Sequence, residues 1–240
     1  MDTDPGTGDA VPSTFHPALV GREAPMADLA DTVRRLIHLV VTNTAPADVL
    51  DSVLADLRAA ETKLAAQVPD VPPPRFFAPN EAGVPATPTS AMRGAMPYDF
   101  VVGRFNPLAL PIELWFEPPQ ARGRAKFTTP YEGGPGWVHG AAIAAAFDIV
   151  LTAANQLAGA AGPTVWLHIR YRRPTLIDLE ARFEAEVVTA TSRRVTSRGR
   201  LIQDGLVCVE AEGEFVPISA HVINRRAREA RGRSAAGGEA

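Results

Sequence analysis

One acidic residue stands in the most apolar segment of the chain. Residues 141–151 read AAIAAAFDIVL, and Asp148 is the only formally charged residue between Glu132 and Arg170. A helix that is apolar on every face is normally buried, so we expect Asp148 to be buried as well. An isolated carboxylate in such surroundings is costly unless it has a partner, is protonated or reaches water. Asp148 is therefore a candidate general base or nucleophile.

Two glycines bracket a histidine where this helix should begin. They are Gly136 and Gly140, on either side of His139 in the sequence GPGWVHG. Backbone N–H groups in the first turn of a helix lack an intrahelical acceptor, and the helix dipole is positive at that end. Such donors would stabilise the negative charge that develops on a carbonyl oxygen held there. The simpler interpretation is that the glycines only permit a tight turn.

The distance between these two groups constrains the assembly. Gly140 and Asp148 are eight residues apart, which is about 12 Å along a helix. One chain therefore cannot bring both groups to the same carbonyl. If both are catalytic, two helices must lie antiparallel across a two-fold axis, so that Gly140 of one subunit faces Asp148 of the other. The spacing predicts a homodimer, or a dimer of dimers, with interfacial active sites.

The same segment resembles the signature of a known family. The pattern His139-Gly140-x(7)-Asp148 is similar to the HGG-x(6)-D/E motif of the PaaI-type acyl-CoA thioesterases of the 4HBT superfamily, and the NPLALP and YRRP segments agree. The resemblance covers about residues 98–217. It implies a hotdog fold and hydrolysis of an acyl-CoA to free acid and CoA, in fatty acid metabolism and without a cofactor. It also implies that the Gly140 amide polarises the thioester, that Asp148 is the nucleophile or base, and that His139 shapes the helix mouth.

A threonine on the strand after the helix extends the resemblance. Many members of the family carry Ser or Thr ten residues before the Pro that ends this strand, and counting back from Pro174 gives Thr164. The count implies that Thr164 orients water or the Asp148 carboxylate. Strand alternation instead places Thr164 on the same face as Trp166 and Arg170, as a plain strand residue.

Two positions depart from the family pattern. The second glycine of HGG is Ala141, and the Asn or Gln that many relatives carry about six residues upstream is replaced by Gly133. Part of the contact to the thioester is then expected to be missing. Glu132 could take over a polar role, although a carboxylate donates a hydrogen bond only when protonated. We expect a reduced or differently tuned activity.

Other residues are candidates for substrate contacts. Arginine suits the CoA phosphates through its bidentate fork, although charged strand ends are usually only solvated. Aromatic side chains near the motif would line an apolar pocket, but the sequence does not specify the acyl group. The candidates are Arg170, Arg172 and Arg173 near the strand end, and Gly136, Trp137 and Glu132 around the helix start.

The rest of the domain must position these groups. Strand patterns occur in DFVVGRF, PIELWFEP and RAKFTTP, before the helix expected from about His139 to Leu157. Strands are also expected near 164–172, 179–189, 194–203 and 206–216. This order predicts an α+β fold in which a curved antiparallel sheet wraps around one central helix, the hotdog arrangement.

Composition divides the chain into five segments. They are a flexible N-terminus at 1–22, a helical hairpin at 23–68, a Pro-rich linker at 69–95, the hotdog domain at 96–220 and a basic flexible tail at 221–240. The apolar stripe of the hairpin needs a partner, because two short helices alone are marginal in water. Either the rest of the chain or another subunit could cover it.

Composition also limits the functional classes. A formal charge of −3 gives no general attraction to nucleic acid or anionic lipid. The single cysteine excludes an internal disulfide, and the five histidines are not spaced as metal ligands. The start lacks the features of a signal peptide, and no run approaches the roughly 18 apolar residues of a membrane span. We expect a cytoplasmic protein without a nucleic-acid, metal or membrane partner.

Two alternatives to hydrolysis stay open. One is a non-catalytic hotdog module that binds acyl-CoA or a partner protein, with the helical hairpin as the interaction element. The other is hydratase or dehydratase chemistry on the same fold, which needs its His beside the α or β carbon of the substrate. Asp148 distinguishes hydrolysis from binding, because only a hydrolase depends on its carboxylate.

Overall fold

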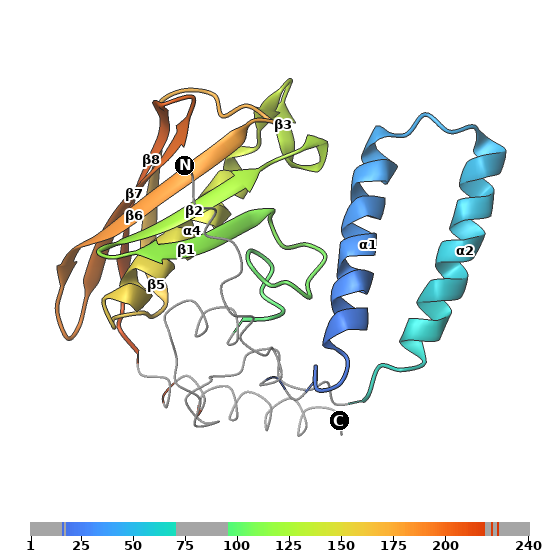
Figure 1. Cartoon of the computed structure of the whole chain (residues 1–240), viewed down its shortest axis with the longest axis horizontal. Helices are drawn as coiled ribbons and strands as arrows, with labels where there is room; N and C mark the ends of the chain where they lie inside the picture. Colours follow the sequence, from blue (N-terminus) through green and yellow to red (C-terminus); the bar gives the residue numbers. More distant parts are fainter. Residues whose placement is uncertain (1–15, 17, 71–95, 219–221, 223–224, 226–240) are drawn as a thin grey trace, which may run out of the picture.

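The computed structural model describes residues 16, 18–70, 96–218, 222 and 225 (Figure 1). Its main feature is a six-stranded antiparallel sheet in the order β1-β2-β6-β7-β8-β5. The expectations for most of 1–22, for 71–95 and for most of the tail lie outside the described residues. The strands are β1 (Ile112–Glu117), β2 (Gln120–Lys126), β5 (Thr164–Tyr171), β6 (Glu180–Ala190), β7 (Val195–Gln203) and β8 (Leu206–Phe215).

A single helix, α4 (Gly140–Leu157), lies along one face of this sheet (Figure 1). It packs mainly against β6, β2 and β7. Its buried face recurs at spacings of three and four, and Phe147 meets Phe183 of β6 edge to face with ring centroids 5.3 Å apart. The predicted α+β hotdog architecture, with a curved sheet around one helix, is confirmed. The short η3 (Thr129–Tyr131) and the β3 (Glu132–Gly134) and β4 (Trp137–Val138) hairpin lead into α4.

Helix α4 corrects one expectation about membranes. Among the described residues it is long and apolar enough to cross a bilayer, with 18 residues and a mean hydropathy of 1.4. Half of it is buried in the structure, and the core helix of a globular domain passes the same test. Its packing against the sheet therefore accounts for its hydropathy.

The DFVVGRF segment does not form the predicted strand. Residues 98–105 are turns, because the Asp99 carboxylate accepts from the amides of Val101 (2.8 Å) and Val102 (3.0 Å). An Asp side chain that satisfies its own downstream amides competes in this way with sheet pairing. Gly103 completes the turn, since a Cβ there would lie 2.4 Å from the Asp99 backbone. Similarly, only the RAK part of RAKFTTP belongs to a strand, because β2 ends at Lys126.

Two N-terminal helices, α1 (Glu23–Thr42) and α2 (Ala47–Ala65), stand beside the sheet domain, with α1 between α2 and the sheet (Figure 1). The side of α1 that carries Ala27 and Ala30 is buried. The Arg34 guanidinium joins α1 to the loop before β1, because it donates to the carbonyls of Arg104 (2.7 Å) and Asn106 (2.8 Å). Helix α2 has no buried residue.

Candidate active site

His139 caps the N-terminus of α4. Its Nδ1 accepts from the Ala141 amide at 3.0 Å, and its own amide donates to the carbonyl of Tyr131 at 2.7 Å. A neutral His139 with Nδ1 as an acceptor carries its proton on Nε2. The side chain is exposed. His139 therefore shapes the helix mouth as a cap, and its Nε2–H is left available as a donor.

The amide of Gly140 is the free donor at this helix end. It has no acceptor among the described residues, which leaves it available to a ligand. The Tyr171 hydroxyl donates to the Gly140 carbonyl at 2.8 Å, and a Cβ on Gly140 would lie 3.1 Å from that hydroxyl. Burial raises the pKa of the Tyr171 hydroxyl above its ordinary value. Tyr171 was missed by the sequence analysis, although its place at the end of the strand was the available signal.

Gly136 serves the turn before the helix. Its φ is +76°, which favours glycine, and its carbonyl accepts from the amide of Ile177 at 3.1 Å. Its amide donates to the Glu132 carboxylate, so Glu132 is engaged within the β3–β4 hairpin. Trp137 is half exposed and forms a bridge with Leu176. For Gly136 the structure supports the simpler interpretation, a tight turn.

Gly133 has a steric reason to be glycine. A Cβ at this position would lie 2.8 Å from the Cα of His139, closer than real Cβ contacts. The Asn or Gln of many relatives would collide with the helix cap in this conformation. The departure from the family pattern is therefore coupled to the way β3 packs against His139.

Asp148 meets Thr164 across the gap between α4 and β5. The Thr164 hydroxyl donates to the Asp148 Oδ1 at 2.5 Å. Asp148 is only partly buried and Thr164 is exposed, so the expectation of a fully buried Asp148 is wrong for the single chain. The reason is the position of β5 at the edge of the sheet, where no further strand of the described residues covers this flank of α4.

The orientation of Thr164 depends on an irregularity in β5. Thr164 pairs with Phe215 of β8, whereas Trp166 pairs with Glu214, so Val165 is an extra residue. Residues paired across strands lie on the same face. Phe215 is buried in the core, so Thr164 faces α4 while Trp166 faces outward. The alternation prediction that Thr164 and Trp166 share a face is thus wrong, because a bulge reverses the alternation at this point.

The three predicted arginines lie at the far end of β5. Arg170 pairs with Glu210 across the ladder and faces outward, away from α4. Arg172 donates to Glu210 through Nε (2.8 Å) and forms an ion pair with it through Nη2 (2.7 Å). Arg173 donates to the carbonyl of Val207 at 3.0 Å. The structure therefore separates Arg170 from the Asp148 side of the sheet.

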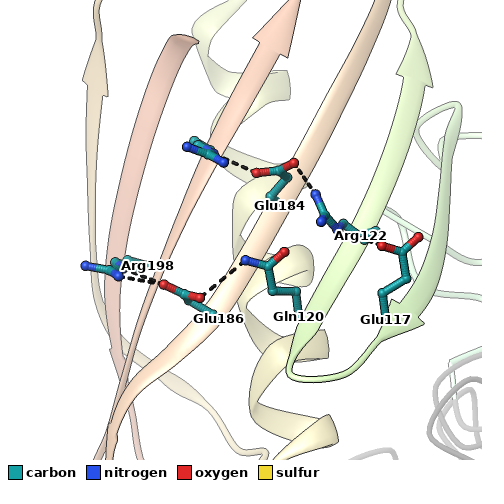
Figure 2. Close-up of polar contacts among 7 residues, drawn as sticks. Glu117, Gln120, Arg122, Glu184, Glu186 and Arg198 are labelled. Carbon is teal, nitrogen blue, oxygen red and sulfur yellow. Dashed lines mark hydrogen bonds and ion pairs between the residues drawn. The ribbon is translucent and has the colours of Figure 1, made fainter. Parts of the chain in front are cut away.

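The outward face of the sheet is a network of ion pairs (Figure 2). Glu184 contacts both Arg122 and Arg200, while Glu186 contacts Arg198 at 2.6 Å and Gln120 at 3.3 Å. Hydrogen bonds from Arg198 and then Gln120 lower the pKa of the Glu186 carboxyl. Most of these charged groups are paired with one another, so this face offers mainly paired charges to solvent. Among the described residues, no three His, Cys, Asp or Glu side chains are grouped as metal ligands.

Comparisons with known proteins agree with the family and the fold. The family model of the thioesterase superfamily, 4HBT, matches residues 135–210, from the β3–β4 hairpin into β8. A crystal structure of protein RHA08564, described as a thioesterase superfamily protein, is 31% identical, covers 80% of this chain and 94% of its own, and has a TM-score of 0.67. The chain belongs to the thioesterase superfamily. The predicted resemblance to the 4HBT superfamily is thereby confirmed. No curated protein matches the chain in sequence.

Other solved thioesterase superfamily structures match less of the chain. Thioesterase superfamily member 2 of zebra fish is 18% identical over 45% of this chain and 82% of its own, with a TM-score of 0.43. A mutant of the phenylacetic acid degradation protein PaaI from Thermus thermophilus is 19% identical over 45% of this chain and 95% of its own, also with a TM-score of 0.43. The match with RHA08564 is longer than the part from residue 96 onward, so it also includes residues before the hotdog domain.

Proposed function

We propose that this superfamily member hydrolyses acyl-CoA thioesters, at active sites shared by two subunits. The observation that carries the proposal is the 2.5 Å hydrogen bond from Thr164 to Asp148. It fixes one carboxylate oxygen in the apolar first part of α4, while the other oxygen has no hydrogen bond among the described residues. A fixed, partly exposed carboxylate of this kind suits a general base or a nucleophile.

Asp148 would act on the thioester in one of two ways. As a base, it removes a proton from water while the water oxygen attacks the carbonyl carbon, and CoA leaves as the thiolate. As a nucleophile, it forms a mixed anhydride that water then hydrolyses to free acid. In both routes negative charge develops on the carbonyl oxygen, and an amide placed beforehand at that oxygen lowers the barrier.

The Gly140 amide is the donor we assign to that oxygen. It is free of acceptors among the described residues and lies at the positive end of the α4 dipole. Since about 12 Å separates Gly140 from Asp148 along one helix, the two groups would come from different subunits. Tyr171 holds the Gly140 carbonyl, so it is a positioning residue for this donor.

The edge strand β5 supports pairing between subunits. One side of β5 is bonded to β8 and the other is the edge of the sheet. Val165 and Trp166 are 48% and 41% exposed there. An edge strand with exposed apolar side chains is a ready template for another strand. Antiparallel pairing of β5 with its copy would continue the sheet and set the two α4 helices antiparallel, as the active-site geometry requires.

A non-catalytic acyl-CoA-binding role is the second candidate. It is favoured by Gly133, since the space beside His139 leaves no room for the polar side chain that many relatives carry. A site that lacks this contact could hold a thioester without polarising it fully. The two candidates differ in their dependence on the Asp148 carboxylate.

The deciding experiment is CoA release, followed with a thiol reagent over a panel of acyl-CoAs. We expect the wild type to release CoA, and Asp148→Asn to reduce kcat by roughly 10²–10⁴-fold, the usual contribution of a general base. Asp204→Asn is the matched control, because Asp204 lies in the β7–β8 turn at φ +49°, a conformation that Asn also adopts. Equal rates for the wild type and Asp148→Asn would refute the proposed mechanism. Binding without release would establish the second candidate.

A further inference from the structure

Helix α2 contributes no side chain to the core that the described residues form. All of its 19 residues, Ala47–Ala65, are exposed, including Leu50, Leu57 and Leu64. An isolated helix of this length is marginal in water, even when its sequence favours helix. Since α1 leaves these leucines exposed, the partner that stabilises α2 must come from elsewhere.

The apolar residues of α2 repeat as in a coiled coil. Leu50, Leu57 and Leu64 follow one another every seven residues, and Val53 and Ala60 fall between them at the second position of the repeat. Such a repeat places one continuous apolar seam along the helix and is typical of helices that pair with other helices. Val49 and Leu54 widen the seam in the first half of α2, and the seam as a whole keeps the heptad spacing that a second helix would cover.

The charges of α2 argue against a lipid surface. The helix carries four carboxylates and two cations. Helices that lie on anionic bilayers are instead rich in Lys and Arg along the polar face. An acidic helix would be repelled from such a surface.

The charged residues beside the seam could form ion pairs with the same residues of a second α2 helix. Asp56 and Lys63 are one heptad apart, so they flank the seam on the same side. When two copies of a helix pair antiparallel about a two-fold axis, this side of one copy faces the same side of the other. In the register that places Leu57 against Ala60 and Val53 against Leu64 of the second copy, Asp56 meets Lys63 of the second copy. The symmetry repeats this ion pair.

We propose that α2 docks antiparallel onto α2 of a second copy of this chain. Leu57 and Val53 fill the shared seam, and two Asp56–Lys63 pairs set its register. The edge strand β5 is on the sheet, whereas α2 lies beyond α1 (Figure 1). The two contacts therefore use different surfaces and can form in one assembly. Pairing through α2 joins two β5-paired dimers into a tetramer.

The test is the mass of the full-length protein, measured by light scattering after gel filtration. We expect the wild type to have the mass of four 25.6 kDa chains, and Leu57→Glu to have half that mass. Ala59→Glu, on the opposite side of α2 from the seam, should keep the wild-type mass. Because Leu57 is exposed within its own chain, Leu57→Glu should leave the melting temperature of the sheet domain and CoA release unchanged.

Charge reversal tests the register directly. Asp56→Lys and Lys63→Asp each place like charges opposite one another and should halve the mass. The double variant restores opposite charges and should restore the mass. The proposal is overturned if Leu57→Glu keeps the wild-type mass, or if the double variant behaves like the single ones. If the wild type has the mass of two chains and Leu57→Glu the mass of one, α2 pairing is upheld and pairing through β5 is refuted.

Discussion

The hydroxyl of Thr164 holds the Asp148 carboxylate in place. Its 2.5 Å bond to Oδ1 is a charge-assisted hydrogen bond, which contributes about 1.5–3 kcal/mol. We expect Thr164→Val, which keeps the side-chain shape and removes the donor, to lower kcat by roughly 10-fold to 100-fold, since about 1.4 kcal/mol corresponds to tenfold. Steady-state CoA release measures this effect.

Thr164→Ser supplies the matched control for this residue. It retains the hydroxyl, so its kcat should stay within a few-fold of the wild type. Thr164 is exposed and lies in an edge strand, so neither variant should change the melting temperature much. If Val and Ser lower kcat equally, the hydroxyl has no role in the reaction.

At the residue scale, sequence counting brought together the residues of the candidate site but did not give the face of each side chain. The spacings from His139 to Asp148 and from Thr164 to Pro174 led to two side chains that the structure brings together. The face that alternation predicted for Thr164 was wrong, because period-two alternation cannot anticipate an extra residue in a strand. Tyr171 was missed because its bond to the Gly140 carbonyl depends on how the strand end folds back over the helix start.

The β3–β4 hairpin restricts what can stand next to the helix cap. A side chain at Gly133 would lie 2.8 Å from the Cα of His139, so the hairpin and the cap would have to separate. We therefore expect Gly133→Asn to destabilise the fold by about 1–3 kcal/mol, as overpacking does, and not to increase CoA release. Thermal unfolding and the release assay measure these two effects.

The neighbouring glycine provides the comparison for this hairpin. A Cβ at Gly134 would meet the Trp137 ring at 3.4 Å, an ordinary contact. Gly134→Ala should therefore unfold close to the wild-type temperature. The opposite outcome is a Gly133→Asn variant that is as stable as Gly134→Ala and releases CoA faster than the wild type. It would show that the absence of an Asn side chain at position 133 limits activity and that the hairpin has room for that side chain.

At the scale of elements, periodicity was reliable where burial creates it. The helix and the four strands after it appear within a few residues of their predicted ends, because each has one face against the core. The segment at 99–105 has the same apolar content but forms turns, since the Asp99 carboxylate takes two backbone amides that a sheet would need. Such a local hydrogen bond competes with the pattern and is hard to foresee from composition.

At the scale of the whole molecule, the sequence could not predict which partner covers three surfaces that are exposed in the single chain. The exposed flank of Asp148, the free edge of β5 and the exposed seam of α2 all lie on surfaces that the described residues do not cover. Sequence patterns report that these residues are apolar or charged, but not which molecule covers them. Both inferred contacts place a second copy there, and they make different predictions about mass and activity.

Removing the backbone N–H of Gly140 tests the oxyanion donor independently of the Asp148 carboxylate. Proline at the first position of a helix is well tolerated, and His139 already has the extended backbone (φ −60°, ψ 131°) that precedes proline. Gly140→Pro thus removes the donor and keeps the helix. Gly140→Ala adds a Cβ near Tyr171 but keeps the amide. We expect the Pro variant to lose CoA release by roughly 10²–10³-fold, the cost of one oxyanion donor, and the Ala variant to lose much less.

Mixing two inactive variants tests whether the sites are shared. If Gly140 and Asp148 of different subunits form one site, a dimer of one Gly140→Pro chain and one Asp148→Asn chain has one site with both lesions and one intact site. Equal amounts of the two chains, unfolded and refolded together, should place about half of the dimers in this mixed form. The mixture should then recover about a quarter of the wild-type rate, whereas each variant refolded alone stays inactive. A mixture as inactive as its components would mean that each chain carries its own complete site, and the two-fold arrangement of α4 would have to be abandoned.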